Sequence, residues 1–296
     1  MTLERLGFGP DERVVIIHAD DLGMCHAANT AFADVVAAGT VACGSIMVPC
    51  PWFLEMAAYA RSHPEADLGV HLTLTSEWNG YRWGPISTRD RASGLLDEQG
   101  YLWPDVASLL EHMHAEAAVR EMRAQMERAL GAGVDVTHID THMGSVVHPA
   151  LTEAYIGLGL EYGLPVMLPR LSREALLARG LPAPVAEALR RAASRAEESG
   201  RLFLIDHITD LDDAVAMRDP ISGYRDLLAS LPPGLTHLIY HAASDTEEAR
   251  AVMGDAAAAR RVIDWRTMSA AAFREVLAES GVRSIGYRDL RRAMRE

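Results

Sequence analysis

The chain has 296 residues and a formal net charge of −13 at pH 7, from 28 basic and 41 acidic side chains. This balance disfavours a nucleic-acid partner, because phosphate binding needs a basic surface. The hydrophobic share of 49% excludes a disordered chain. No lysine occurs in the sequence, which excludes a Walker-type phosphate loop and Schiff-base catalysis. Proton transfer must therefore fall to His, Asp, Glu, Tyr or Cys.

The cysteines and the N-terminal segment indicate the compartment. Cys25, Cys43 and Cys50 form no CxxC pair and are odd in number, as in a reducing environment. The first residues are charged and lack the apolar stretch of a secretory signal. Glycines and prolines interrupt the uncharged residues 35–54. We therefore expect a cytoplasmic protein without a membrane span.

Short apolar runs alternate with longer amphipathic stretches along the chain. The runs predict strands at residues 13–18, 41–47, 67–74, 134–139, 165–168, 202–205, 235–240 and 283–287. The stretches predict helices near residues 26–38, 52–62, 105–130, 149–162, 183–198, 220–230, 246–262 and 270–280. About eight β-then-α units imply an α/β fold with a mostly parallel sheet, closed into a barrel or left open. No composition shift divides residues 1–296, which predicts a single domain.

Two segments depart from this alternation. Residues 78–104 have little periodicity and several aromatic side chains, which is typical of a lid or binding loop. Residues 170–200 are rich in Ala, Arg and Glu, and we expect them to form a helical insertion on the outside of the fold.

Polar residues gather where the predicted strands end. In a parallel α/β fold these ends meet at one rim, where functional residues lie. We therefore expect one site built from His18, Asp20, Asp21, His71, His138, Asp140, His142 and His241.

The residue types at this rim favour a hydrolytic metal site. Two imidazoles and one carboxylate can hold one divalent ion and leave positions open to water and substrate. Of the adjacent pair Asp20 and Asp21, one could bind the ion while the other takes a proton. Neighbours in an extended chain point in opposite directions and should not share one role. A histidine on another strand could protonate the nitrogen that leaves in amide cleavage.

The order of four motifs adds a resemblance to a known family. H-A-D-D-L-G-M, G-V-H-L-T-L-T, T-H-I-D-T-H and a late strand ending in Y-H resemble the YdjC-type, or chitooligosaccharide deacetylase-like, carbohydrate deacetylases, which are related to the polysaccharide deacetylases. The resemblance runs from about residue 13 to residue 287. It implies a distorted (β/α) TIM-like barrel, a divalent metal held by Asp-His-His, and removal of an acetyl group from an N-acetylated sugar.

The resemblance also assigns roles. Asp21, His71 and His142 match the metal ligands, Asp20 matches the base, and His241 matches the acid. Spacing alone does not decide between His138 and His142 as the direct ligand. If His138 is not the ligand, it could orient a ligand or pack beneath one, and Asp140 could orient a ligand or occupy a turn.

Simpler interpretations remain open for several of these residues. Asp20 and Asp21 could merely cap the next helix, and His71 could be a hydrogen-bonded core residue. Trp78, Tyr81 and Trp83 could stack on a sugar ring, although packing between loop and helix would explain them almost as well.

The expected partner is a small saccharide, with no nucleic acid and no membrane; a homo-oligomer is compatible with the sequence. The ion could be Mg²⁺ or Zn²⁺. The alternatives are a metal-dependent sugar isomerase or phosphoesterase on a similar barrel, and a catalytically silent sugar-binding protein.

Overall fold

The protein is built around a parallel β-sheet, seen here in a computed structural model that describes residues 1–41, 43–170, 172–178 and 180–296. The strand order is β4-β3-β2-β1-β6-β5, and β7 pairs with β1. The strands are β1 (Arg13–Leu22), β2 (Cys43–Ile46), β3 (Asp67–Leu72), β4 (Ile139–Thr141), β5 (His207–Asp210), β6 (Gly234–Tyr240) and β7 (Arg283–Ser284).

The sheet curls on itself, and single parallel bridges continue it between β4 and β5. Ile139 bridges to Val166, and Pro169 bridges to Ile205. The strands predicted at 165–168 and 202–205 are therefore extended segments with one bridge each, and the strand predicted at 134–139 begins only at Ile139. Residue 42, within the strand predicted at 41–47, lies outside the described residues. The expected α/β class is confirmed, as a distorted TIM-like barrel.

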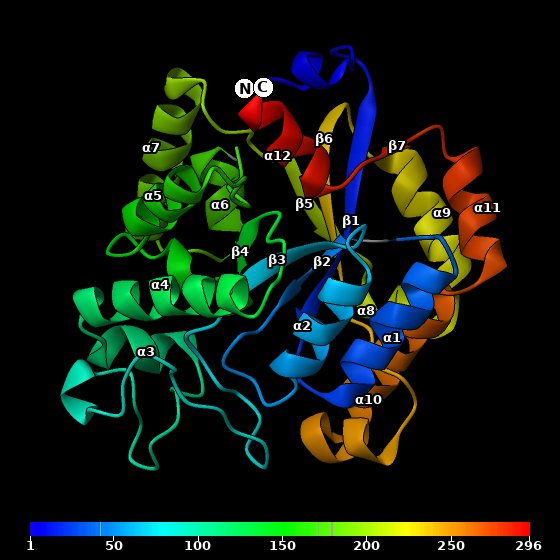
Figure 1. Cartoon of the computed structure of the whole chain (residues 1–296). Helices are drawn as coiled ribbons and strands as arrows, with labels where there is room; N and C mark the ends of the chain where they lie inside the picture. Colours follow the sequence, from blue (N-terminus) through cyan, green and yellow to red (C-terminus); the bar gives the residue numbers. More distant parts are fainter. Residues whose placement is uncertain (42, 171, 179) are drawn as a thin grey trace.

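Helices flank the outside of the curled sheet (Figure 1). They are α1 (His26–Ala37), α2 (Phe53–Ser62), α3 (Val106–His112), α4 (Ala115–Gly131), α5 (Thr152–Tyr162), α6 (Arg173–Ala178), α7 (Ala183–Ser199), α8 (Asp213–Arg218), α9 (Pro220–Ser230), α10 (Glu247–Met268), α11 (Ala271–Glu279) and α12 (Tyr287–Arg295). The helix predicted at 105–130 is split between α3 and α4, because Met113 has an extended backbone.

Side chains of β1 alternate between two buried environments. Val15 and Ile17 pack with the flanking helices in the large core, whereas Val14 and Ile16 pack with Tyr287 of α12 in a smaller one. Because residues two apart in a strand share a face, the face of Val14 and Ile16 continues to His18 and Asp20. The apolar interior of the barrel thus gives way to a polar layer toward the carboxyl ends of the strands.

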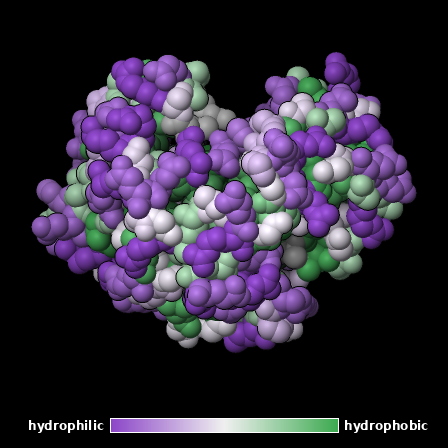
Figure 2. Space-filling view, turned by 90° about the horizontal axis from the view of Figure 1, so that it is seen from above, coloured by the Kyte–Doolittle hydropathy of each residue, from purple (hydrophilic) through white to green (hydrophobic). Residues whose placement is uncertain are grey.

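The two ends of the barrel differ. Both chain termini and α12 lie at the amino ends of the strands, at the top of Figure 1. Hydrophilic residues dominate this end in the space-filling view (Figure 2). Residues 78–104 lie at the opposite end, where Glu121 of α4 accepts hydrogen bonds from the backbone N–H groups of Ile86 and Ser87. Among the described residues, no helix has both the length and the apolar character needed to cross a membrane.

Candidate functional site

The end of β1 delivers two adjacent carboxylates to one place. Asp21 has a φ of 65°, a left-handed backbone that is uncommon outside glycine, and the pairing of β1 with β2 shifts register between Ala19 and Leu22. His241 Nε2 consequently lies 3.9 Å from Asp20 Oδ2 and 4.0 Å from Asp21 Oδ2. The expectation that these neighbours point in opposite directions is wrong, because it assumed an extended chain at Asp21.

Asp21 faces two histidines from other strands. Its Oδ1 lies 3.1 Å from Nδ1 of His142, just after β4, and 3.4 Å from Nε2 of His71 on β3. All three residues are buried, and one atom from each lies within 4.8 Å of the others. The structure thus brings together the three residues that the sequence suggested as metal ligands.

In each imidazole, the ring nitrogen that does not face Asp21 contacts another carboxylate. Asp140 Oδ1 lies 2.8 Å from His71 Nδ1, and both oxygens of Glu77 lie 3.1 Å from His142 Nε2. Burial opposes a charge on these rings, but the carboxylates outweigh it: they raise the pKa of His142 to about 9 and that of His71 well above its usual value. Ser45 donates to the second oxygen of Asp140 at 2.9 Å. Such partners orient metal-binding histidines in proteins.

The second oxygen of Asp21 is held by a guanidinium. Arg261 of α10 donates to Asp21 Oδ2 at 2.6 Å, and Asp21 Oδ1 is buried without a hydrogen bond of good geometry. Burial would raise the pKa of Asp21, but Arg261 and His142 hold it well below its usual value. An ionised, unsatisfied oxygen between two imidazoles suits one divalent ion. The charge of the site also suits a cation, because its described residues include four carboxylates (Asp20, Asp21, Glu77 and Asp140) and one guanidinium, that of Arg261.

Asp20 faces the same space with one oxygen. Its Oδ1 accepts a hydrogen bond from His18 Nδ1 at 2.7 Å, and its Oδ2 lies 3.9 Å from His71 Nε2. Burial opposes ionisation, but the neighbouring His71 and His18 lower the pKa of Asp20. Asp20 is therefore an ionised acceptor beside the three clustered residues.

His241 follows β6 at the edge of the site, and its side chain is 41% exposed. Desolvation by the surrounding walls, together with the Arg261 guanidinium, lowers its pKa. Its backbone N–H donates to Asp264 of α10 at 3.3 Å. The imidazole lines the same cavity as His71, and the two residues lie just after β6 and within β3, strands on different sides of β1 in the sheet order.

These residues border a cavity of about 640 Å³. One side carries the charged and imidazole groups described above, and the other is aliphatic. The aliphatic wall consists of Val147, Met167, Pro169, Leu176, Leu181, Leu189, Ile208 and Ile239. Since the three leucines belong to residues 170–200, that segment is not a purely external insertion: Leu176 of α6, Leu189 of α7 and Leu181 between these helices form part of the cavity wall. Residues 171 and 179 lie outside the described part of the chain.

The aromatic residues of the 78–104 loop have different positions. Trp78 lines the cavity, and its buried Nε1 has no hydrogen-bond partner among the residues that the structure describes. Tyr81 and Trp83 do not belong to the lining formed by the described residues. Their polar atoms donate to backbone carbonyls, Tyr81 to Met24 at 2.7 Å and Trp83 to Thr75 at 2.8 Å. They hold the loop against the barrel, which is the packing role left open for them above.

Sequence reasoning missed Glu77, Ser45 and Arg261. Glu77 stands next to Trp78 and six residues after His71, so its nearness to a motif was the one available signal. Ser45 and Arg261 sit within an apolar strand and a long helix, where no local pattern marks them. His138 lies deeper, with its Nε2 2.8 Å from His18 Nε2, and is not among the three clustered residues around Asp21 Oδ1.

Comparisons with known proteins show which family the chain resembles. Residues 14–279 match the family model described as YdjC-like protein. A carbohydrate deacetylase of Thermus thermophilus is 35% identical over 94% of both chains. One from Brevibacillus brevis is 31% identical over 53% of this chain and 60% of its own. A solved structure from Enterococcus faecalis V583, of a candidate cellobiose-phosphate cleavage protein, has a TM-score of 0.75 at 21% identity and covers 94% of this chain and 99% of the other. The last similarity concerns the fold alone.

Proposed function

Because the chain belongs to the YdjC-like family, we propose that it is a carbohydrate deacetylase, a hydrolase that removes the acetyl group of an N-acetylated sugar or short oligosaccharide with the help of one divalent ion. The observation that carries this proposal is the convergence of Asp21, His71 and His142 beside the free oxygen of Asp20. Relatives named carbohydrate deacetylase support the substrate class.

Asp21, His71 and His142 would hold the ion, with Mg²⁺ and Zn²⁺ both compatible with this donor set. When bound, the ion supplies Lewis acidity that polarises the amide carbonyl and lowers the pKa of the attacking water. Asp140 and Glu77 keep the two imidazoles oriented. Arg261 holds the second oxygen of Asp21, so that Oδ1 alone faces the two rings.

Asp20 and His241 would move the protons. Asp20 Oδ2 is ionised, faces the cavity and lies beside the proposed ligands, so it can take the proton of the attacking water. His241 Nε2, 3.9 Å from the same oxygen, is placed to pass a proton to the nitrogen that leaves. The aliphatic wall would accept the acetyl methyl or another apolar part of the saccharide, and Trp78 would offer its free N–H to a sugar oxygen.

Acetate release tests the proposal. Purified protein is incubated with N-acetylglucosamine and its short oligomers, with and without a chelator. We expect acetate and a free amine at a rate that the chelator abolishes and added Zn²⁺ or Mg²⁺ restores. Saccharide binding without acetate release would indicate a silent sugar-binding protein. Release of phosphate from a sugar phosphate, or isomerisation of the sugar, would favour the rival metal-dependent enzymes.

A further inference from the structure

A hydrogen-bonded chain of buried side chains runs behind Asp20 through the interior of the barrel. Asp20 Oδ1 accepts from His18 Nδ1 at 2.7 Å, and His18 Nε2 lies 2.8 Å from His138 Nε2. His138 Nδ1 lies 2.9 Å from Thr137 Oγ1, which also shares a hydrogen bond with Asp67 Oδ1. His18, Thr137 and His138 are fully buried, and Asp67 is 5% exposed. The chain thus links the rim of the site to the first residue of β3, at the other end of the barrel.

Packing fixes the ring planes in this chain. Tyr287 stacks on His138, with ring centroids 4.0 Å apart and planes inclined by 16°. A Cβ atom added to Gly69 would come within 2.5 Å of the His138 ring, so glycine is needed there for His138 to occupy its position. The His237 ring lies 4.8 Å from that of His18. The imidazoles therefore cannot turn to find other partners.

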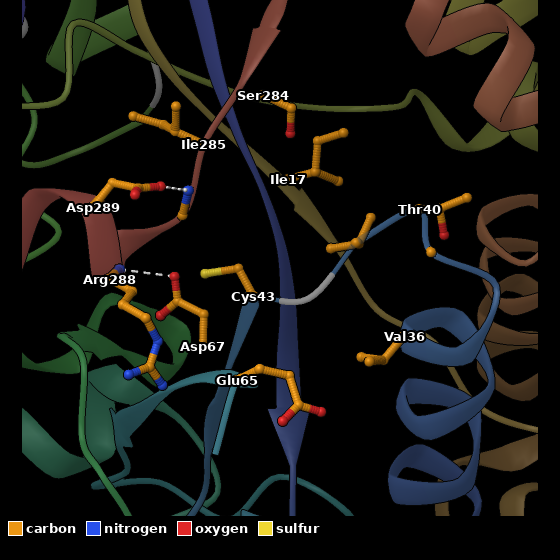
Figure 3. Close-up of a pocket in the computed structure, with 13 residues that line it drawn as sticks. Ile17, Val36, Thr40, Cys43, Glu65, Asp67, Ser284, Ile285, Arg288 and Asp289 are labelled. Carbon is orange, nitrogen blue, oxygen red and sulfur yellow. Dashed lines mark hydrogen bonds between the residues drawn. The ribbon is translucent and has the colours of Figure 1, made fainter. Parts of the chain in front are cut away.

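The far end of the chain reaches a second cavity, of about 370 Å³, shown in Figure 3. The cavity lies at the amino end of the barrel and is bordered by residues of β2 and β7, which pair with different parts of β1. Exposed residues such as Glu65 and Ser284 line its wall. Asp67 borders it, and the backbone N–H of Arg288 donates to Asp67 Oδ2 at 2.8 Å. Asp67 therefore stands between the protein interior and the opposite surface.

Counting the hydrogens shows which atom donates in each hydrogen bond between Asp20 and Asp67. As the base of the proposed function, Asp20 is a carboxylate and only accepts, so His18 Nδ1 carries a hydrogen, and a neutral His18 then accepts at Nε2. His138 must donate there from its Nε2, which leaves its Nδ1 to accept from the Thr137 hydroxyl. Thr137 Oγ1 can then only accept from Asp67. Every hydrogen bond is made when Asp67 is a carboxylic acid.

The alternative arrangement, with Asp67 ionised and His18 protonated on both nitrogens, places two more charges in the buried interior, which costs free energy. Burial raises the pKa of Asp67, although the hydrogen bond from the Arg288 N–H opposes the shift. Burial also lowers the pKa of His138 well below its usual value, and the nearby His18 adds to the effect. Both pKa shifts favour the arrangement in which Asp67, His138 and His18 are neutral.

We propose that Asp67 is a positioning residue for Asp20: through Thr137 and His138 it fixes His18 as a neutral donor to Asp20 Oδ1, which leaves Oδ2 free to face the substrate. The inference rests on the proposed function only for the role of Asp20 as the base. Thr137, His138 and His18 transmit the effect and do not touch the substrate cavity.

The same histidines also lie near Cys43, and one donor atom from each of His18, Cys43 and His138 lies within 4.8 Å of the others. A second metal site would need these atoms to be free. Both ring nitrogens of each histidine already have a partner, and burial raises the pKa of the Cys43 thiol well above its usual value, so it stays protonated. The hydrogen-bonded chain accounts for the cluster without an ion.

Long-range ¹H–¹⁵N spectra of histidine-labelled protein test the arrangement directly, because they report which ring nitrogens carry hydrogen. We expect His18 as the neutral Nδ1–H tautomer and His138 as the neutral Nε2–H tautomer, assigned with single His→Asn variants. A doubly protonated His18, or either ring in the other tautomer, would overturn the proposal. This readout needs neither substrate nor metal, so it remains decisive if the chain releases no acetate.

Two variants of Thr137 form a matched pair for the effect on turnover. Thr137→Val keeps the shape and removes the hydroxyl, whereas Thr137→Ser keeps the hydroxyl. We expect Thr137→Val to lower kcat for acetate release about 10-fold, with KM and metal affinity unchanged and a mixture of His138 tautomers. Thr137→Ser should stay within about two-fold of the wild type. Equal kcat values for the two variants would contradict the proposal.

Asp67→Asn provides a second test if Thr137→Val does not fold. The amide donates to Thr137 Oγ1 as the carboxylic acid does, and it can still accept from the Arg288 N–H. We expect wild-type tautomers and nearly wild-type kcat. A large loss of kcat in this variant, with a folded protein, would show that Asp67 must ionise and would overturn a purely positioning role.

Discussion

Nδ1 of His71 lies 2.8 Å from Oδ1 of Asp140, and the Nε2 atom of the same ring faces Asp21 at 3.4 Å. The Asp140 carboxylate therefore occupies Nδ1 of His71 and leaves Nε2 available to a cation. Ser45 holds the other oxygen of Asp140, so the orientation is set by β2, β3 and β4 together, before any ion binds.

This relationship predicts the effect of Asp140→Asn. An amide is uncharged and binds the His71 N–H more weakly, so the ring loses both orientation and basicity. We expect the affinity for Zn²⁺ to fall about 10–100-fold, the usual effect of losing such a partner, while the variant stays folded. Calorimetric titration of chelator-treated protein measures the affinity, with Asp213→Asn, a carboxylate 84% exposed on α8, as the control. An unchanged affinity would mean that Asp140 does not orient His71 toward an ion.

His241→Ala separates proton donation from binding. His241 lies at the edge of the cavity and is not one of the three clustered residues, so the variant should still bind one ion. Cleavage of the amide should slow by about 10²–10⁴-fold, the range expected for acid–base help. Cleavage of an activated ester, whose leaving group needs no proton, should slow much less. If cleavage of the amide and of the ester slows by the same factor, His241 positions the substrate and does not protonate it.

The rim of the site was predictable from the sequence because parallel strands end at one edge. His71, His142, Asp20 and Asp21 lie at or just after the carboxyl ends of strands that the apolar pattern marks. The direction of the two aspartates was not predictable, because the left-handed backbone of Asp21 breaks the extended geometry that the pattern implies. Glu77 and Arg261 reach the site from a loop and a helix, and only tertiary structure brings them there.

The same reasoning explains the errors in the fold. Residues 165–168 and 202–205 have the composition of buried strands, but each pairs through one bridge only, because β-propensity reflects burial more than ladder formation. The 170–200 segment was expected on the outside because it is rich in Arg and Glu. Leu176, Leu181 and Leu189 of this segment nevertheless line the cavity, and the composition of the whole segment does not reveal these three positions.

His237 makes the stability of the fold depend on pH. Burial, with the nearby His18, lowers the pKa of His237 to about 3, so the folded state keeps the ring neutral, with its Nδ1 hydrogen-bonded to the Tyr287 hydroxyl at 2.9 Å. Between the unfolded value of about 6.5 and 3, the unfolded chain binds a proton that the folded chain does not. The stabilisation is therefore complete above about pH 6.5 and is lost as the pH falls toward 3.

Urea unfolding at several pH values tests this expectation. The free energy of unfolding should decrease by up to about 1.4 kcal/mol per pH unit for this histidine below pH 6. His237→Gln should be less stable at pH 7 and should show a shallower dependence on pH. An identical slope in the variant would mean that His237 titrates alike in the folded and unfolded states.

The aliphatic wall should contribute to substrate binding. Leu181, between α6 and α7, lines the cavity, whereas Leu177 of α6 is partly buried in the core and lies outside the lining formed by the described residues. We expect Leu181→Ser to raise KM about 10-fold, the loss expected when an apolar contact of about 1–2 kcal/mol is removed. Since this contact is the same in ground and transition states, kcat should change little.

Leu177→Ser is the matched control for this prediction and should leave KM near the wild-type value, although it lowers stability. Steady-state acetate release at several saccharide concentrations gives both constants. If the two variants raise KM equally, the wall acts through the packing of α6 and not through contact with the substrate.

The central claim is that Asp21, with His71 and His142, holds one divalent ion while Asp20 takes the proton. Titration of chelator-treated wild type, Asp20→Asn and Asp21→Asn with Zn²⁺ in a calorimeter tests it most directly. We expect one ion per chain for the wild type and for Asp20→Asn, which should nevertheless release almost no acetate, and greatly weakened binding for Asp21→Asn, with activity partly recovered in excess Zn²⁺. If Asp21→Asn binds the ion like the wild type while Asp20→Asn does not, the two roles are reversed; if the wild type binds no ion, the account is wrong.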